Sequence, residues 1–337
     1  MHQQVMGFKA GAAGVPERAG VNRGGPLSLT PRTGPHDGPL GCRWSALLAH
    51  AAGADAWRGI VALGGPRSVA GAPASAWVGA GLPPRVAACA GWGCCPPSER
   101  RSDWVCAGDR AWPPYLDNVS HGPVALAWEG NLSLLAASRV AIVGARACTA
   151  RGRAIAREVA AYVAARGGAV VSGLAWGIDA EAHLAAAGST IAVLGQGLRA
   201  AHPAWQVALR RRVREAGGLL LSDLPSDQGP RPWTFPRRNR VLAALAPVVV
   251  VVEAGVRSGT RSTVRHALDM GREVYAVSGP PDSPNSQGCN LMIDEGAHPL
   301  AGPVDLARLD AYLAGYPVPD RPYAVRHVAA DLWGVAS

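Results

Sequence analysis

Short apolar runs recur through the middle of the chain, and amphipathic segments separate them. The runs are rich in β-branched residues, and polar positions rarely interrupt them. Runs of this kind are typical of strands buried on both faces of a parallel sheet. They lie at Pro123–Trp128, Val140–Val143, Ala169–Val171, Thr190–Leu194, Gly218–Ser222, Val248–Val252 and Glu273–Val277. The pattern therefore predicts six or seven strands.

The segments between these runs have helical spacing. Helices are expected over Ala150–Arg166, Ile178–Ala187, Pro203–Ala216, Phe235–Leu245, Ser258–Met270 and Asp305–Ala314. Thr149 is suited to cap the first helix, and Gly167-Gly168 marks its end. Ser278–Gly288 is expected to be a Pro-rich loop. Alternating strands and helices predict an α/β fold, with a Rossmann-like, doubly wound and mostly parallel sheet.

The two ends of the chain lack this alternation. Residues 1–41 are rich in Gly, Pro, Ala and Arg and are expected to be disordered. Residues 42–110 form an irregular, poorly specified region, interpreted as a small helical unit with one helix at Arg43–Ala54. The Rossmann-like domain is expected over residues 111–315. Residues 316–337 then form a tail too short for another domain.

The charge balance is basic. The 337 residues carry a net charge of +9, with a pI of about 9.6, and Lys9 is the only lysine. An excess of arginine is compatible with an anionic partner. It is equally compatible with the residue usage of a GC-rich gene, so charge alone does not identify nucleic acid.

The cysteines and the hydropathy pattern indicate a reducing, cytoplasmic location. There are seven cysteines, an odd number, and no secretory leader is visible. Cys89, Cys94, Cys95 and Cys106 cluster without Cys-x-x-Cys spacing, which favours free thiols over a zinc site. No apolar stretch is long enough to span a membrane.

Five loops that follow predicted strands have the same character. Each contains glycine with small or hydroxyl-bearing neighbours: Gly144-Ala145-Arg146, Ser172-Gly173, Gly195-Gln196-Gly197, Ser258-Gly259-Thr260 and Ser278-Gly279. Glycine lets the backbone approach a ligand, and hydroxyls and helix amides bind phosphate oxygens. Five such loops on one sheet edge predict a phosphate-bearing ligand. A Gly-x-Gly-x-x-Gly fingerprint is absent, which disfavours an ordinary dinucleotide, and no cofactor is expected.

Arginines gather at the start of one predicted helix. Phe235-Pro236-Arg237-Arg238-Asn239-Arg240 places three guanidinium groups beside a helix N-terminus. That arrangement is unfavourable for stability and favourable for binding polyphosphate. Arg146 follows a strand-terminal glycine and is expected at the same edge. Phe235 and Trp233 are the nearest aromatic candidates for base stacking, although either could belong to the core.

Few residues suggest catalysis. Asp179 is interpreted as a helix cap, and Asp179 with His183 as a structural pair rather than an acid–base pair. Glu253 ends the five-valine strand, where it could accept a hydrogen bond from a base or ribose, or hold Arg240. No catalytic triad, carboxylate pair or set of metal ligands stands out.

Taken together, these residues resemble the DNA-processing protein A family (DprA, also called Smf). The resemblance covers about residues 112–300 and includes Ser-Gly-x-Ala-x-Gly-Ile-Asp at Ser172–Asp179 and Phe-Pro-x-Arg-Asn-Arg at Phe235–Arg240. Further matches are Val140–Arg146, Thr190–Leu198, Val249–Glu253, Gly271–Val274 and Gly288–Ala297. Ala145, Arg261 and Ser278 depart from the family pattern.

The resemblance implies an extended Rossmann domain that binds single-stranded DNA. It further implies a homodimeric mediator, not an enzyme, that protects incoming DNA and loads the recombinase RecA during natural transformation. The expected DNA-binding residues are Gly144, Arg146, Ser172, Gly173, Arg237, Arg238, Asn239, Arg240, Ser258 and Gly259.

Two alternatives stay open at this point. The first is an enzyme acting on a nucleotide, of the phosphoribohydrolase type. In this chain the stretch Glu253–Thr260 lacks the glutamate that such enzymes carry after the threonine. The second is an inactive relic of the family, which the irregular first 110 residues favour.

Overall fold

A computed structural model describes residues 73–79, 103–106, 111–117, 119–120, 122–123, 125–200, 203–301 and 303–314. The expectations for residues 1–41, for a helix at Arg43–Ala54 and for the tail at 316–337 lie outside these ranges. Within the described part of residues 42–110 there is one short helix, α4 (Ala74–Gly79), and one strand, β1 (Asp103–Cys106).

The centre of the fold is a nine-stranded sheet in the order β1-β2-β6-β5-β4-β3-β7-β8-β9. β2 pairs antiparallel with β1 and with β6, and every other pair is parallel. The remaining strands are β2 (Ala125–Gly130), β3 (Arg139–Val143), β4 (Ala169–Ser172), β5 (Thr190–Val193), β6 (Leu219–Ser222), β7 (Val248–Val251), β8 (Glu273–Val277) and β9 (His298–Leu300). The predicted α/β class with a mostly parallel sheet is confirmed.

All seven predicted strands are present, and two further strands were not predicted. β1 lies in the region interpreted as helical, and β9 has only three residues. Both lie at outer edges of the sheet. An edge strand needs no continuous apolar run, because only part of it is covered, and so the hydropathy pattern did not reveal it.

Most helices follow the predicted positions. They are α6 (Ala150–Ala165), α7 (Ile178–Ala185), α8 (Ala204–Glu215), α9 (Thr234–Leu245) and α10 (Thr260–Asp269). Thr149 caps α6 as expected, because its side chain accepts a hydrogen bond from the Gly152 amide. Short 3-10 helices are η2 (Pro114–Leu116), η3 (Leu132–Ala136) and η4 (Ala307–Leu309).

One loop prediction and one helix prediction were wrong. Half of the expected loop Ser278–Gly288 is helical, because α11 (Pro284–Asp294) begins with a proline in its first turn, where proline is tolerated. Gly288 lies inside this helix against the carbonyl groups of Ala254 and Gly255. The single helix expected at Asp305–Ala314 is instead α12 (Pro303–Leu306), η4 and α13 (Asp310–Leu313).

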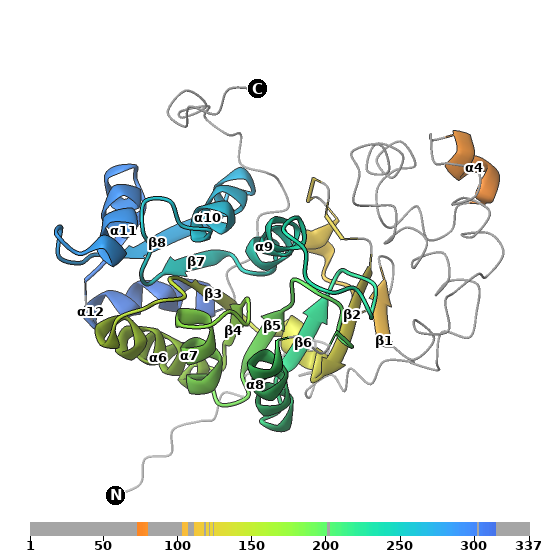
Figure 1. Ribbon diagram of the computed structural model, residues 1–337, viewed down its shortest axis with the longest axis horizontal. Coiled ribbons are helices and arrows are strands. Elements are labelled where there is room, and N and C mark those ends of the chain that lie inside the picture. Colours follow the sequence, from red (N-terminus) through yellow and green to blue (C-terminus); the bar gives the residue numbers. More distant parts are fainter. Residues whose placement is uncertain are drawn as a thin grey trace, which may run out of the picture.

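Helices cover the sheet (Figure 1), and the sheet separates two hydrophobic cores. In β7, Val249 and Val251 enter one core while Val248 and Val250 enter the other. The first core includes residues from α8, α9, α10 and α11, and the second includes residues from α6 and α7. Burial on both faces is the reason for the uninterrupted valine run.

Candidate nucleic-acid interface

Loops from distant parts of the sequence meet at the position in the sheet where the strand order reverses. From β3 the chain proceeds through β4, β5 and β6 on one side, and then returns to add β7, β8 and β9 on the other. Open α/β sheets bind ligands at such a switch point, beyond the carboxyl ends of the strands. The loops with glycine and small residues identified in the sequence all follow parallel strands of this sheet.

The loop after β4 is held in place by two buried side chains of α7. The Asp179 carboxylate accepts hydrogen bonds from the amides of Gly173 (3.1 Å) and Ala175 (3.3 Å). Burial raises the pKa of Asp179, and the Arg238 guanidinium and these two amides oppose that shift. Asp179 therefore binds the amides of this loop and does not cap the start of its own helix, which corrects the prediction that it is a helix cap.

His183 secures the next residue of the same loop. Its Nε2 accepts from the Leu174 amide (3.3 Å), and its Nδ1 lies 2.7 Å from the Thr190 hydroxyl oxygen. Burial, together with nearby Arg238, lowers the pKa of His183 to about 3. The imidazole is thus neutral at physiological pH, as its role as an acceptor requires. Asp179 and His183 are structural, as predicted, but each binds the loop rather than the other.

Ser172 and Gly173 have different roles from those expected of ligand-binding residues. The Ser172 hydroxyl is fully buried and donates to the Ile142 carbonyl (2.6 Å), so it joins β4 to β3. A Cβ on Gly173 would collide with the Arg238 guanidinium. Gly173 is therefore required so that this arginine can lie under the loop.

Arg238 is the centre of the site. It is 5% exposed, and its Nη1 donates to the Val193 carbonyl (3.2 Å). Its buried Nε has no hydrogen-bond partner among the described residues. Burial lowers the pKa of Arg238, Asp179 opposes that shift, and Arg146 adds to it. The Arg238 side chain thus turns inward from the first turns of α9.

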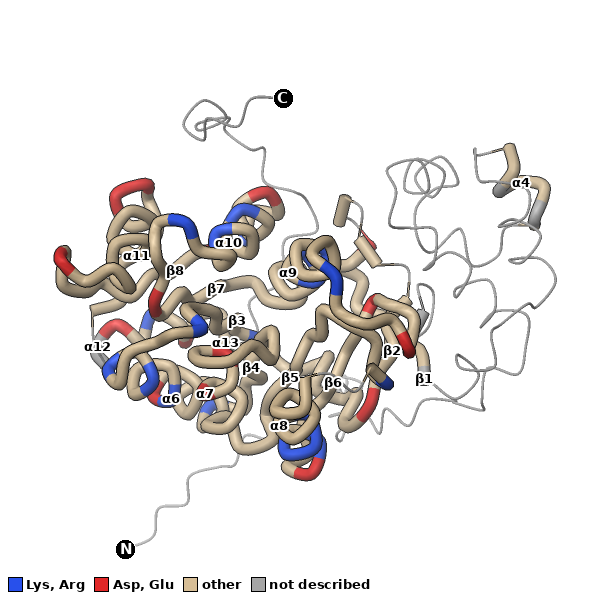
Figure 2. The backbone as a smooth tube through the Cα atoms, viewed as in Figure 1, with Lys and Arg blue, Asp and Glu red and all other residues tan. Residues whose placement is uncertain are grey.

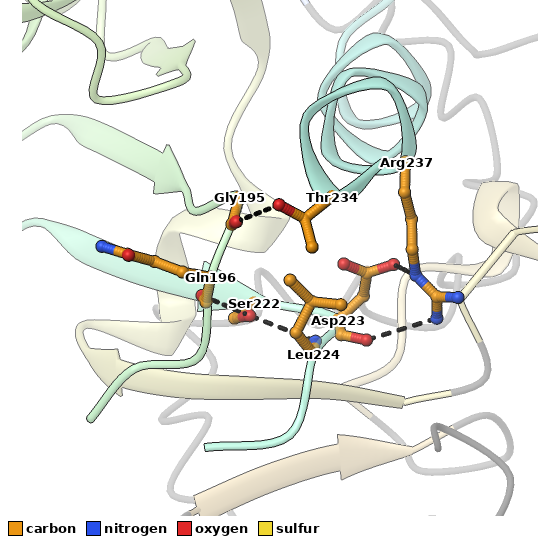
Figure 3. A network of polar contacts seen from close by, with 7 residues as sticks. All are labelled: Gly195, Gln196, Ser222, Asp223, Leu224, Thr234 and Arg237. Carbon is orange, nitrogen blue, oxygen red and sulfur yellow. Dashed lines mark hydrogen bonds and ion pairs between the residues drawn. The ribbon is translucent and has the colours of Figure 1, made fainter. Parts of the chain in front are cut away.

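The beginning of α9 is fixed to the loops after β5 and β6 (Figure 3). The Thr234 hydroxyl donates to the Gly195 carbonyl (2.6 Å). The Arg237 Nε donates to the Asp223 carboxylate (2.6 Å), and both side chains are nearly buried. Arg237 is therefore an anchor of α9. No side-chain hydrogen bond caps the helix at Trp233, and the Thr234 amide donates to the Arg231 carbonyl (3.0 Å).

Arg146 and Phe235 lie on the accessible side of this arrangement. The Arg146 guanidinium carbon is 5.7 Å from the centroid of the Phe235 ring, and Arg146 is exposed. Phe235 is half-buried and packs against Gly195. Gly144 packs tightly on the Ile178 side chain. The loops after β3 and β5 thus meet over the first turn of α9.

Arg240 and Asn239 extend the site along α9, and both are half-buried. Burial lowers the pKa of Arg240, nearby Arg237 adds to the shift, and Asp223 opposes it. The arginine cluster is defined as Arg146, Arg237, Arg238 and Arg240; the Asp179 carboxylate lies near Arg238, and the Asp223 carboxylate lies near Arg237 and Arg240. Figure 2 shows basic positions on α9 together with those on α8 and α10.

The loops on the other side of β3 are closed by contacts within the protein. The Ser258 hydroxyl donates to the Thr260 hydroxyl (3.0 Å), while Gly259 is exposed with open space around it. The Gly279 amide and carbonyl are both bound by the Asn290 side chain.

Glu253 accepts hydrogen bonds from the Thr149 amide (2.9 Å) and hydroxyl (2.5 Å). It thus clamps the start of α6. The nucleotide-enzyme alternative compared the stretch Glu253–Thr260 with a loop of phosphoribohydrolase-type enzymes. In this structure the Glu253 carboxylate is already hydrogen-bonded to Thr149.

A network behind the site was missed by sequence reasoning. Gln206 of α8 donates to the Leu174 carbonyl (3.1 Å) and accepts from Gln196 and Arg210. Arg210, in a run of arginines on the same helix, is 6% exposed and donates to the Ala200 carbonyl (2.8 Å). Polar residues at helical spacing could not show that one of them turns inward.

Two exposed aromatic residues were also missed, Trp176 after β4 and Trp205 in the first turn of α8. Their ring centroids are 5.3 Å apart. The signal in the sequence was only that Trp176 lies within the Ser172–Asp179 motif.

Over the described ranges, no group of three or more His, Cys, Asp or Glu residues could hold a metal ion. Cys148 and Cys289 are free and buried; of the clustered cysteines, Cys89, Cys94 and Cys95 lie outside the described residues. None of the helices described is long and apolar enough to cross a membrane.

Comparison with known proteins gives a consistent result. The Smf protein of Escherichia coli K12 is 41% identical over 203 residues, covering 59% of this chain and 54% of the relative. DNA processing protein A of Streptococcus pneumoniae has a similar structure, with a TM-score of 0.62 at 32% identity over 70% of this chain and 86% of that one. That of Helicobacter pylori, whose structure concerns a single-stranded DNA binding mode, gives 0.57 at 25% identity over 64% and 96%. The chain spans about half the length of the curated relatives it matches, 54% and 49% for the first two.

The sequence model of one family matches most of the described sheet and its helices. That family is described as DNA recombination-mediator protein A, and the match runs over residues 103–309. It is a family of DNA-binding mediators rather than of enzymes. The motifs, the fold and these comparisons agree, and the chain belongs to the DNA recombination-mediator protein A family.

Proposed function

We propose that this chain binds single-stranded DNA across the arginine cluster and acts as a recombination mediator. The proposed contacts are the residues expected from the sequence, with Arg146, Arg240 and the first turn of α9 touching phosphates directly. Ser172, Gly173, Arg237 and Arg238 act by shaping the surface, since they are buried or already bonded. Gly144, Asn239, Ser258 and Gly259 complete the proposed set.

One observation carries this proposal. An exposed arginine from the loop after β3 lies over a phenylalanine at the start of α9, above a buried second arginine. Guanidinium groups and helix amides bind phosphate, and an aromatic face binds a base. The combination suits a strand whose bases are unpaired, because stacking on Phe235 requires a free base face.

The wider role follows from the family. We infer that the bound strand is incoming DNA during natural transformation, that the protein protects it, and that RecA is loaded onto it. We also infer a homodimer and a cytoplasmic location. These proposals rest on the family's description as a recombination mediator and on the likeness to DNA processing proteins.

Fluorescence anisotropy of a labelled oligothymidylate, titrated at several salt concentrations, tests the DNA proposal. We expect salt-sensitive binding that an unlabelled single strand displaces more readily than a duplex does. Binding that prefers the duplex, or no binding by folded protein at low salt, would contradict it.

RecA loading has a separate test. RecA filament formation would be followed on an oligonucleotide coated with single-strand-binding protein, with and without this chain. Faster filament formation is expected when the chain is added. An unchanged rate, with DNA binding intact, would remove only the mediator step.

A further inference from the structure

Trp176 and Trp205 form an exposed aromatic corner beside the arginine cluster. Trp176 is 57% exposed and Trp205 36%, although tryptophan is usually well buried. Their rings lie at 81° with centroids 5.3 Å apart, an edge-to-face arrangement. Each ring therefore restricts the other, while most of the Trp176 side chain remains open to solvent.

The corner is built on the loop that also covers Arg238. Trp176 lies between Ala175, whose amide binds Asp179, and Gly177, which has a φ of 85°. A Cβ on Gly177 would collide with the carbonyl groups of Ala145 and Arg146, so this turn packs directly on the loop after β3 that carries Arg146.

Trp205 is positioned from the other side by its neighbour. Gln206 donates to the carbonyl of Leu174, two residues before Trp176 in the chain. The first turn of α8 is thus tied to the turn that carries Trp176, and the two indoles have a fixed relation to the arginine cluster.

We propose that the Trp176–Trp205 corner is a second stacking platform, which takes bases of the single strand as it leaves the arginine cluster toward α8. This inference rests on the proposed DNA binding. Two arguments favour a nucleic acid over an apolar protein partner. The corner is continuous with the arginine cluster through the contact of Gly177 with Arg146. In addition, exposed Arg212 follows Trp205 by seven residues, close to two helical turns, and so shares its face of α8.

Paired oligonucleotides separate stacking from other effects. Binding of Trp176→Ala and Trp205→Ala would be measured with an oligothymidylate and with an abasic oligomer of the same length, which keeps the phosphates but has no bases. Each variant is expected to lose about tenfold in affinity for the oligothymidylate. Affinity for the abasic oligomer is expected to change by less than about twofold, because phosphate contacts remain.

Two further variants serve as controls. Trp176→Phe keeps a stacking face and should restore most of the affinity. Leu268→Ala removes an exposed apolar side chain on α10, which is 56% exposed, and should leave affinity unchanged.

Equal losses on both oligomers would overturn the stacking proposal and indicate a structural role. Unchanged affinity in both tryptophan variants would overturn it in favour of a protein partner. In either case, continued loss of binding in Arg146→Ala would keep the proposed function standing. Absence of DNA binding by the unaltered protein would overturn both.

Photocrosslinking provides a measurement on the unaltered chain, so misfolding of a variant cannot confuse it. An oligonucleotide with 5-iodouracil in place of thymine would be irradiated in the complex, and the crosslinked peptides identified by mass spectrometry. Peptides containing Trp176 or Trp205 are expected. Crosslinks confined to the start of α9 would overturn the proposal.

Discussion

On the β4–β5 side of β3, the strand-end loops rest on buried arginine, aspartate and histidine. On the β7–β8 side, loops of the same composition are closed by their own hydroxyl and amide groups. Gly173 faces the Arg238 guanidinium, whereas Gly259 has only open space around it. A Gly- or Ser-containing loop after a strand therefore does not define a binding site by itself. The side chains packed behind the loop determine whether it forms one.

The largest effect is expected from a methyl group at Gly173. Gly173→Ala would displace buried Arg238, so the free energy of unfolding should fall by about 3 kcal/mol. Affinity for an oligothymidylate should fall by more than tenfold, roughly, if Arg238 shapes the phosphate site. Denaturant unfolding and anisotropy would measure these changes. Gly259→Ala, on the other side of β3, is the matched control for the unfolding measurement, because a methyl group there meets open space. If both glycines tolerated alanine equally, the contrast between the two sides would be lost.

A pH effect should distinguish the buried histidine from an exposed one. The folded-state pKa of His183, about 3, lies below the ordinary value of 6.5. Below pH 6.5 the unfolded chain therefore binds a proton that the folded chain does not, and stability falls as the pH falls toward 3. From this residue, unfolding at pH 5 should require about 2 kcal/mol less than at pH 6.5.

Urea titrations at several pH values would measure this slope. His183→Gln should flatten it, since a glutamine oxygen can still accept from the Leu174 amide. His298→Gln is the control on the opposite side of the sheet, where the imidazole is half exposed beside Glu273. A slope that His183→Gln leaves unchanged would contradict the buried, neutral imidazole.

Removing the exposed arginine should weaken binding without unfolding the protein. Arg146→Ala is expected to reduce affinity for an oligothymidylate about tenfold. It should also make the slope of the logarithm of affinity against the logarithm of salt concentration shallower by about one. Arg151→Ala is the matched control, because Arg151 is also exposed but donates to the Ser278 carbonyl on the other side. Equal losses in the two variants would indicate a diffuse electrostatic surface rather than a site.

The smallest effect concerns the β7 loop. If Ser258 touches DNA, Ser258→Ala should reduce affinity by about threefold, the contribution of one ordinary hydrogen bond. Ser278→Ala is the control, and anisotropy with the same oligothymidylate would measure both. No change in Ser258→Ala would restrict the interface to the β4–β5 side and the start of α9.

Local patterns in the sequence were sufficient to predict the fold class, the seven inner strands, most helices and the family. These depend on local patterns, since burial on both faces requires apolar runs and caps require particular residues such as Thr149. Edge strands β1 and β9 and helix α11 did not follow from such patterns. Their formation depends on pairing with a neighbour strand, or on packing of Gly288 against the backbone of Ala254.

Tertiary contacts determine which charged side chains stay accessible to a ligand. Arg237, Arg238 and Arg240 are nearly adjacent along the chain and have the same chemistry. The first pairs with Asp223, the second is buried under Gly173, and the third is half-buried. The positions of Asp223 and Gly173 relative to α9 depend on strand order in the sheet. Sequence spacing carries no information about that order, because contacts between distant segments are set by how the whole sheet packs.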